Sequence, residues 1–337
     1  MQLAVLNPGG KDPNQTFPDF AGAPSDTAHP PVNFHGYAAC TAGGFYRHDE
    51  AIPAERTNVL MLMRGNLKSC RQPLIEFSRA KKVTVVSLKE SGLFQAGALL
   101  SDPGRLQLFQ EICWQADAAI SPVEELLPIY RAAGMRVVEF IPTPYPVEDE
   151  RWNFSHPLEE RQGIFVGTRE FDVESRNHLA TLLTVLPLAT AMGEPITVIN
   201  TNGWRGRRLL AKLGYPEGWL RVIEGRRPYP EYLRLMARHK LVFQLDASCV
   251  PGQVAGDALL CRVPCVGGNG TTERIAFPDL CGHGRTPEQL FDLAARLLEH
   301  PHDCAEVIER ALQAAKHRLS FAAAARELES LFHRFGR

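Results

Sequence analysis

Short apolar runs alternate with longer amphipathic segments along most of the chain. In the first half, three β-branched or apolar runs are bounded by glycine, lysine or turn residues, which predicts strands at 3–7, 58–65 and 82–88. A helix is predicted between the last two, at 68–81, and Pro73 has to lie near its first turn. Its apolar face carries Leu74, Ile75 and Phe77. This alternation is typical of parallel βαβ units.

The segment 11–55 departs from this pattern. It is rich in proline, glycine, histidine and aromatic residues and has little periodicity, which predicts long loops over one face of the domain. Long loops inside a compact domain are often functional. After residue 100 the alternation returns, with a helix, a strand, a helix and a strand predicted at 105–115, 116–122, 123–134 and 136–146. The last strand runs into three prolines, which we interpret as the edge of a domain.

The pattern restarts after the polar stretch 147–161. Five strands are predicted in the second half, at 163–168, 196–200, 220–225, 240–246 and 264–268. The segments between them predict four helices, at about 174–192, 205–213, 229–239 and 253–260. From Pro287 onward the spacing of apolar residues is near 3.6, so the rest of the chain is predicted to be helical.

These elements predict an α/β protein of two Rossmann-like, doubly wound domains that face a central cleft. A chain of 337 residues is long enough for two domains, because single cores stop growing below this length. We expect an N-terminal domain at 1–150, a C-terminal domain at 151–320 and a last helix at 321–337 that packs back on the first domain. Open parallel sheets bind ligands outside the carboxyl ends of their strands.

Composition and charge narrow the class of protein. Apolar residues make up 45% of the chain and charged residues 22%, as in soluble globular proteins. Lys and Arg total 37 against 38 Asp and Glu, so no overall positive field favours nucleic acid as a partner. No apolar run reaches the roughly 18 residues of a membrane span, and the first residues do not resemble a signal peptide. We therefore expect a cytoplasmic protein, with peripheral contact to a membrane left open and the oligomeric state unknown.

The eight cysteines do not suggest a disulfide framework in a chain of this size. Four of them lie within 33 positions, with His283 beside the last, and raise the question of a zinc site: Cys249, Cys261, Cys265 and Cys281. The middle two flank the end of a predicted helix and the start of a buried strand, where free cysteine is common. We therefore interpret them as core residues and expect no metal.

Polar residues gather at strand ends in the second half. Arg169 follows the strand at 163–168, and Arg176 and Asn177 stand at the start of the next helix. Two guanidinium groups and a helix N-terminus on one strand end suit a diphosphate, although two solvated surface arginines would look the same.

The last predicted strand is followed by three glycines that let backbone approach a ligand closely: Gly267, Gly268 and Gly270. Thr271 and Thr272 would add hydroxyl and amide groups, although a plain turn fits as well. Asp257, in or near a helix, would accept hydrogen bonds from a ribose diol, or it is the N-cap of that helix.

Common nucleotide and hydrolase motifs are absent from the sequence. The first strand is not followed by G-x-G-x-x-G, and neither the phosphate-binding G-x-x-x-x-G-K-[ST] nor the nucleophile motif G-x-S-x-G occurs.

The order of several short motifs resembles GT-B glycosyltransferases of the family-4 type. The run "ADAAISPVEELLPIYRAAGMRVVEFIPTPYP" is similar to the end of that family's first domain, and "IFVGTREFDVESRN" to its donor loop, with Arg169 as the arginine and Arg176 in place of the lysine. "RPYPEYLRLMARHKLVFQLDAS" and "DALLCRVPCVGGNGTTE" resemble two later motifs, with Asp257 as the second acid of E-x7-E. The resemblance covers roughly 115–285.

The chain departs from the family pattern at three places. Cys249 stands where the first acid of E-x7-E is expected, and Asp246 or Gln253 are the candidates to replace it. Arg262 replaces a small glycine, and the strand end that often carries a histidine reads "SLKESG" instead.

The resemblance implies a retaining, metal-independent enzyme that moves a sugar from a nucleotide diphosphate sugar to an acceptor hydroxyl, with no other cofactor. It implies catalytic roles for Arg169, Arg176, Lys89 and Glu90. For the donor it implies Gly167, Thr168, Asn202, Arg227, Tyr229, Asp246, Gln253, Asp257, Gly268, Thr271 and Thr272. We expect the acceptor to contact Gly9, Gly10, His35 and Arg64. An epimerase or phosphorylase of the same fold is a second reading. A third is a degenerate GT-B protein that binds a sugar, a nucleotide or a protein without turnover.

Overall fold

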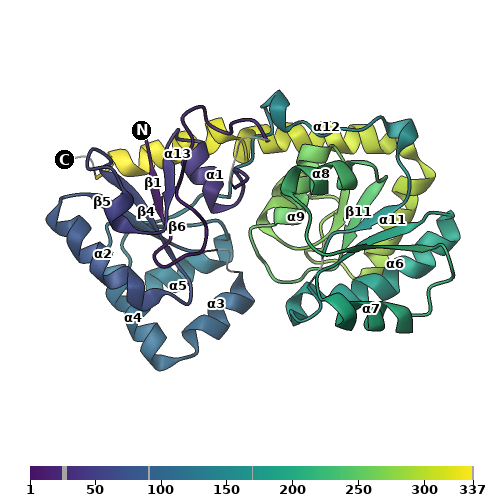
Figure 1. Cartoon of the computed structure of the whole chain (residues 1–337), viewed down its shortest axis with the longest axis horizontal. Helices are drawn as coiled ribbons and strands as arrows, with labels where there is room; N and C mark the ends of the chain where they lie inside the picture. Colours follow the sequence, from purple (N-terminus) through teal and green to yellow (C-terminus); the bar gives the residue numbers. More distant parts are fainter. Residues whose placement is uncertain (25–28, 90–91, 169, 336–337) are drawn as a thin grey trace. The chain divides into compact units, whose positions relative to one another are not determined.

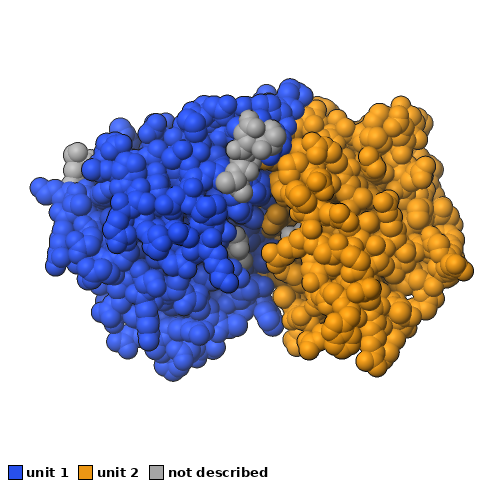
Figure 2. All heavy atoms as spheres, viewed as in Figure 1, with its two compact units in different colours: residues 1–151, 249–251, 316–337 blue, residues 152–248, 252–315 orange. Residues whose placement is uncertain are grey.

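The computed structural model describes residues 1–24, 29–89, 92–168 and 170–335. The chain forms two compact units, coloured separately in Figure 2. The first unit consists of Met1–Arg151, Cys249–Pro251 and Lys316–Arg337, and the second of Trp152–Ser248 and Gly252–Ala315. Each unit contains its own sheet. Because the first unit consists of three separate segments, residues far apart in the sequence are packed together in it.

The first unit is built on a seven-stranded sheet in the order β2-β3-β1-β4-β5-β6-β7. Its strands, in chain order, are Ala4–Leu6, Gln15–Thr16, Gly44–Tyr46, Asn58–Met63, Val83–Leu88, Ala118–Ser121 and Val138–Phe140. All neighbours run parallel except β2, which pairs antiparallel with β3. The central strands are buried along nearly their whole length, as expected when helices cover both faces of a parallel sheet.

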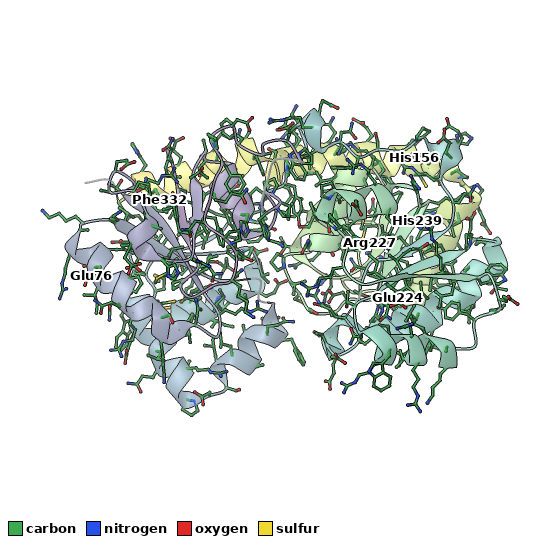
Figure 3. All side chains as sticks on the ribbon, in the orientation of Figure 1. Glu76, His156, Glu224, Arg227, His239 and Phe332 are labelled. Atoms are coloured by element: carbon green, nitrogen blue, oxygen red, sulfur yellow. The ribbon has the colours of Figure 1, made fainter. Side chains whose placement is uncertain are left out.

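Helices cover both faces of this sheet (Figure 1). They are α1 (Phe34–Ala39), α2 (Leu67–Arg79), α3 (Leu93–Leu100), α4 (Pro103–Gln115), α5 (Leu127–Ala132) and α13 (Phe321–His333), with short 3-10 turns at Asp49–Ala51, Glu124–Leu126 and Glu150–Trp152. One core joins α2, α4 and α5 to the sheet around Phe109 and Tyr130. The other joins α1 and α13, through Phe34, Leu328 and Phe332 (Figure 3).

The prediction of long loops over the whole of 11–55 is wrong. This segment contains α1 and β3, and β3 pairs parallel with β1, Val5 lying opposite Phe45. Both elements are short, six and three residues, so neither shows a hydrophobic period in the sequence. Their stability comes from burial in the tertiary structure.

The helix α2 also differs from its prediction. It begins at Leu67, so Pro73 lies in its interior and not in its first turn. A proline there cannot donate the usual hydrogen bond to the carbonyl four residues earlier. Leu74 and Phe77 are buried on the core side, whereas Ile75 is 37% exposed and does not belong to the buried face. Burial of the core-facing residues offsets the loss at Pro73.

The second unit has a five-stranded parallel sheet in the order β10-β9-β8-β11-β12. Its strands, β8 to β12, are Ile164–Val166, Ile196–Asn200, Leu220–Glu224, Leu241–Gln244 and Cys265–Gly267. Numbered along the unit, this order is 3-2-1-4-5, that of a Rossmann fold, and the direction of winding reverses between β8 and β11. The predicted α/β class with two Rossmann-like sheets is confirmed, and the central cleft stays a prediction.

The helices of the second unit are α6 (His178–Met192), α7 (Gly203–Lys212), α8 (Tyr229–Ala237), α9 (Gln253–Cys261), α10 (Thr271–Ala276), α11 (Pro287–Glu299) and most of α12 (Pro301–Arg318). Two 3-10 turns lie at Leu158–Glu160 and Glu174–Arg176. The crossovers that contain α6 and α7 move away from β8 in one direction, and those with α8 and α9 return in the other. Because such crossovers are right-handed, the two pairs cover opposite faces. No helix within the described ranges is both long and apolar enough to cross a bilayer.

Candidate functional site

The carboxyl ends of β8 and β11 form the point where the winding of the second unit reverses. The loops that follow these strands are bound to each other. Leu245 donates its backbone N–H to the Thr181 hydroxyl at 3.0 Å, and its carbonyl accepts from Asn177 Nδ2, also at 3.0 Å. Asn177 itself has φ 48°, a left-handed conformation that asparagine tolerates better than most residues. This geometry starts α6 beside the loop after β11.

Arg176 and Asp246 join across this point. A terminal guanidinium nitrogen of Arg176 donates to Asp246 Oδ2, and Nε lies 3.1 Å from the Glu170 carboxylate without the alignment of a hydrogen bond. Burial by itself would lower the pKa of Arg176, but the charge of Asp246 and its hydrogen bond raise it above the ordinary value. The guanidinium is therefore a fixed positive charge, already accompanied by two carboxylates.

A second polar pair consists of Gln244, the last residue of β11, and Glu273, in the first turn of α10. Gln244 Nε2 donates to Glu273 Oε1 at 2.9 Å. Glu273 is fully buried, and burial raises its pKa to about 7. The other oxygen of each side chain, Gln244 Oε1 and Glu273 Oε2, is buried without a hydrogen-bond partner in the described structure. Buried acceptors of this kind are costly unless a ligand or water donates to them.

Two glycines allow the backbone to close over this carboxyl group. A Cβ on Gly252 would lie 2.0 Å from Glu273 Oε2, and one on Gly268 would lie 2.6 Å from Gln244 Nε2. Both residues have positive φ, 90° and 74°, so a side chain at either position would strain the backbone as well. Gly268, which the sequence predicts to bind the donor, therefore lies against the Gln244–Glu273 pair.

Thr168 and His178 form a third buried contact. The hydroxyl of Thr168 lies 2.9 Å from His178 Nδ1, and the imidazole packs edge-on against Phe171 at 4.3 Å between ring centroids. Burial lowers the pKa of His178 to about 4, so the ring is neutral near pH 7. Its Nε2 has no hydrogen-bond partner among the described atoms.

Asp257 is not an N-cap. It is the fifth residue of α9, whose cap is Gly252, and it is fully buried. Its carboxylate accepts a hydrogen bond from the hydroxyl of Tyr229, the first residue of α8. The tyrosine ring packs against Trp152 at 6.2 Å. Asp257 and Tyr229 are thus brought together between α8 and α9.

The remaining predicted donor residues lie around the same edge of the sheet. Asn202 precedes α7 and donates to Asp172 at 2.9 Å, which ties the loops after β8 and β9 together. Arg227 is exposed, three residues after Glu224 at the end of β10 (Figure 3). Gly167 directly follows β8, and Gln253 begins α9.

Thr271 and Thr272 are the first two residues of α10 and are buried. The stretch after β12 is therefore a helix start and not a plain turn.

In the first unit, His35 and Lys89 are brought together. His35 lies on α1, stacked between the rings of His29 and Phe45 at 3.6 and 3.7 Å. Lys89 follows β5, and its Nζ lies 3.1 Å from an Asp12 oxygen and 5.8 Å from the centre of the Phe45 ring. Burial, and then the charges of His29 and Lys89, hold the pKa of His35 well below its usual value. His35 Nε2 is buried without a hydrogen-bond partner in the described structure.

Asn66 connects the two loops that carry the other predicted acceptor residues. Its side-chain amide donates to the Pro8 carbonyl at 2.8 Å and accepts from the Arg64 backbone N–H at 2.6 Å. Gly9 and Gly10 follow in the first loop, where a Cβ on Gly10 would lie 2.1 Å from the Asn7 side chain. Gly9, Gly10 and Arg64 therefore share the carboxyl edge of the first sheet at β1 and β4.

Asp12, His29 and His35 form a possible trio of metal ligands, with one atom of each within 4.8 Å of the others. The arrangement does not fit a metal well. The Lys89 ammonium already binds Asp12, and the two imidazoles are stacked within 12° of parallel, so their in-plane lone pairs do not converge on one point.

The eight cysteines all lie within the described residues and form no disulfide, and all but Cys249 are buried. Within the described ranges none belongs to a group of metal-ligating residues. Cys265 illustrates the packing role, since its sulfur lies 3.6 Å from Gln244 Nε2 beneath the site.

Two residues predicted to be catalytic, Arg169 and Glu90, lie outside the described residues. Sequence reasoning missed five residues that the structure places in these clusters: Asp12, His29, His178, Gln244 and Glu273. A signal existed for Glu273, because it ends the motif that begins at Asp257.

No protein-family model and no curated protein sequence matches this chain. Solved structures do match. A UDP-forming trehalose-phosphate synthase from Burkholderia vietnamiensis has a TM-score of 0.63 at 12% identity, over 83% of this chain and 72% of that one. An α-glucosyltransferase in complex with UDP-glucose and DNA containing an abasic site has a TM-score of 0.59 at 9% identity, over 99% of both chains.

A chain of the GtfA/B complex has a TM-score of 0.57 at 13% identity. The match covers 82% of the present chain and 57% of that chain, so the present chain spans little more than half the length of this relative.

Proposed function

We propose that this chain, which has the GT-B fold of glycosyltransferases, transfers a sugar from a nucleotide diphosphate sugar to an acceptor hydroxyl. We infer that the reaction retains anomeric configuration and needs no metal, as the motif resemblance implies. Support for a nucleotide-sugar donor comes from similar structures described as UDP-forming or as holding UDP-glucose.

The observation that carries the proposal is the polar cluster at the point of reversal in the second sheet. Arg176 supplies a fixed positive charge for a leaving diphosphate, and Asp246 holds it in place. Gln244 Oε1 and Glu273 Oε2 are buried acceptors that hydroxyl groups of the donor sugar would satisfy. Ligands of open parallel sheets bind at such a point, outside the carboxyl ends of the strands.

Glu273 is also placed to replace the missing first acid of the E-x7-E motif. Cys249 stands at the position of the first acid, yet Glu273 Oε2 lies directly against Gly252, three residues further along the same loop. In this proposal Glu273 takes over the acidic contact to the donor sugar. Its pKa of about 7 means that this group exists partly as the neutral acid, which both donates and accepts hydrogen bonds.

In the proposed reaction, charge grows on the diphosphate oxygens as the bond to the sugar breaks. Arg176 stabilises that charge in a partly buried site, where such a donor is worth more than in water. The departing phosphate takes the proton of the acceptor hydroxyl, so the scheme requires no side-chain base. Lys89 and His35, which lie together in the first unit, orient the acceptor.

The test is a panel of nucleotide diphosphates and their sugars. Thermal unfolding of the purified chain is followed with the diphosphates UDP, GDP, ADP and TDP and with the monophosphate CMP, with and without EDTA. The proposal expects one diphosphate to raise the melting temperature equally in both conditions, because a ligand that binds only the folded state stabilises it. The matching nucleotide sugar should then be consumed on addition of sugar or lipid acceptors. Loss of the shift with EDTA would contradict metal independence.

A second function is favoured by two observations. Arg176 is already accompanied by Asp246 and Glu170, and Cys249 replaces an acid, which is what a GT-B protein that binds without turnover would show. Such a binding module would be stabilised by a nucleotide or a sugar. It would neither hydrolyse nor transfer the donor, even in single-turnover conditions with excess protein.

A further inference from the structure

The surface formed by α6 and α7 in the second unit is unusually free of acidic groups. Between His178 and Pro216 the sequence contains one acid, Glu194. That residue is buried, and its carboxylate is bound by Lys240. The same stretch contains four arginine or lysine residues, all of them on α7, so the charge of this surface is positive and is concentrated on that helix.

The basic residues of α7 lie mostly on one face. Arg205, Arg208 and Lys212 are spaced by three and four positions, which aligns them along the solvent side of the helix. Gly206 and Leu210 are buried on the opposite side. In the described structure the three basic side chains form no ion pair, whereas the fourth, Arg207, binds Glu224 at 3.4 Å.

Apolar side chains extend this basic face. Trp204, at the start of α7, is 63% exposed, and the Arg205 guanidinium lies 5.8 Å from the centre of its ring. The helix α6 has no lysine, arginine, aspartate or glutamate in its 15 residues. Leu179 and Leu183 are one turn apart on its exposed side, at 43% and 54% exposure.

The two helices lie on the same face of the sheet, because they belong to consecutive right-handed crossovers from β8 to β9 and from β9 to β10. Figure 1 shows α6 and α7 next to each other along the sheet. The loop after α7 is bound to α6 through the Tyr215 hydroxyl, which donates to the Leu182 carbonyl. We call Leu179, Leu183, Trp204, Arg205, Arg208 and Lys212 the α6–α7 face.

We propose that the α6–α7 face docks on an anionic lipid surface. Peripheral helices bind bilayers in this way, with aliphatic and indole groups entering the interface while lysine and arginine lie at the anionic head groups. Nucleic acid would use the basic residues but leaves the aliphatic side chains of α6 in water. A second copy of the chain would bring two positive faces together, which is unfavourable.

The proposal does not depend on glycosyl transfer, so it is tested without any donor. The purified chain is sedimented with vesicles of phosphatidylcholine alone or mixed with an equal part of phosphatidylglycerol. We expect binding to the mixed vesicles only, and a marked loss of it at high salt because surface charges are then screened. Equal binding to both vesicles, or to neither, would overturn the proposal.

Two variants separate the contributions of the basic and the apolar side chains to vesicle binding. Arg205→Glu with Arg208→Glu should weaken vesicle binding more than tenfold, since each basic residue near an anionic surface contributes several-fold to affinity. Leu183→Ser should weaken it about threefold while leaving the salt dependence in place. The matched control, Arg105→Glu with Arg131→Glu on exposed positions of the first unit, should bind as the unchanged chain does.

Nucleic acid or a second copy of the chain on the α6–α7 face would give results distinct from those of a lipid surface. Duplex DNA binding that the double reversal abolishes, without vesicle binding, would assign the face to nucleic acid. A doubled mass in solution that the same reversal halves, again without vesicle binding, would assign it to a second copy. Either result overturns the lipid assignment. Circular dichroism of each variant confirms that the fold is intact.

Discussion

The guanidinium of Arg176 binds the carboxylate of Asp246 across the carboxyl ends of β8 and β11, although the two residues are 70 positions apart. This contact fixes the loop after the first strand of the second sheet to the loop after the fourth. It therefore holds together the two segments between which a Rossmann-like sheet binds its ligand.

Removing this contact should cost stability as well as activity. Arg176→Ala leaves Asp246, only 5% exposed in its side chain, with an uncompensated negative charge, and we expect a loss of about 2 kcal/mol in the free energy of unfolding. Consumption of the donor should fall more than tenfold, since the charge on the diphosphate loses its partner. Urea denaturation and a donor-turnover assay measure the two effects.

The control is Arg207→Ala. Its ion pair with Glu224 is exposed on both sides, so the loss should stay below about 1 kcal/mol and turnover should not change. Equal effects of the two substitutions would remove the special role given to Arg176.

Glu273 should make the chain less stable as pH rises. Its pKa is about 7 in the folded chain against 4.5 ordinarily, so the folded state holds the proton more tightly. The contribution of Glu273 to stability is then complete below pH 4.5, declines as pH rises toward 7 and levels off above it, by about 3 kcal/mol in all. Glu273→Gln, which stays neutral, should remove this decline. Denaturation of both proteins at pH 5 and pH 8 decides the question, and identical pH slopes would show that Glu273 is not the source.

His178 should make the chain less stable as pH falls. Burial lowers its pKa to about 4 from 6.5, so the folded state binds the proton less tightly than the unfolded chain. Its contribution is complete above pH 6.5 and is lost as pH falls toward 4, by about 3 kcal/mol. The ring resonances of His178 in NMR spectra should not titrate above pH 5. A midpoint near 6.5, as for an exposed histidine, would refute the assignment.

Lys89 should affect the acceptor and not the donor. Its ammonium lies beside Asp12 and Phe45 in the first unit, whereas the donor is proposed to bind the second. Lys89→Met should raise the acceptor KM about tenfold, the loss expected for one charge-assisted hydrogen bond. The affinity for the nucleotide diphosphate, measured by calorimetry, should stay the same. If the substitution changed only the affinity for the nucleotide, the assignment of Lys89 to the acceptor site would be wrong.

Gly252→Ala should disturb the cluster without removing any of its charged groups. The new methyl group would lie 2.0 Å from Glu273 Oε2, at a residue with φ 90°. Both the overlap and the strained backbone are unfavourable, and we expect a loss of about 2 kcal/mol in stability. Gly193→Ala, at a residue with positive φ but open space, isolates the contribution of the backbone. A similar loss in both variants would mean that contact with Glu273 contributes little.

The long regular elements could be predicted from the sequence because their pattern repeats. The apolar run at 82–88 predicts β5, which begins one residue later and ends at the predicted residue. The spacing near 3.6 from Pro287 onward predicts the start of α11, which begins at Pro287. By contrast, β3 has three residues and α1 has six, so neither contains a full period. Such elements form because the rest of the unit buries them.

The clusters were harder to predict than the strands. The sequence places Arg176 and Asp246 at two strand ends but does not say that they bind each other, since any strand order could follow from the same pattern. Asp257 could be a helix cap until the start of α9 is known to be Gln253. Glu273 gained its raised pKa from complete burial, which no local pattern predicts.

The first unit is discontinuous along the chain, and this has a consequence for its synthesis. Its second core contains Leu328, Leu331 and Phe332 from α13, which pack with residues of α1 and β1. A ribosome that has produced residues 1–151 has therefore not yet made all the side chains that this core needs. The second unit, almost contiguous in sequence, can complete its sheet first, and the first unit has to wait with exposed apolar groups until α13 emerges.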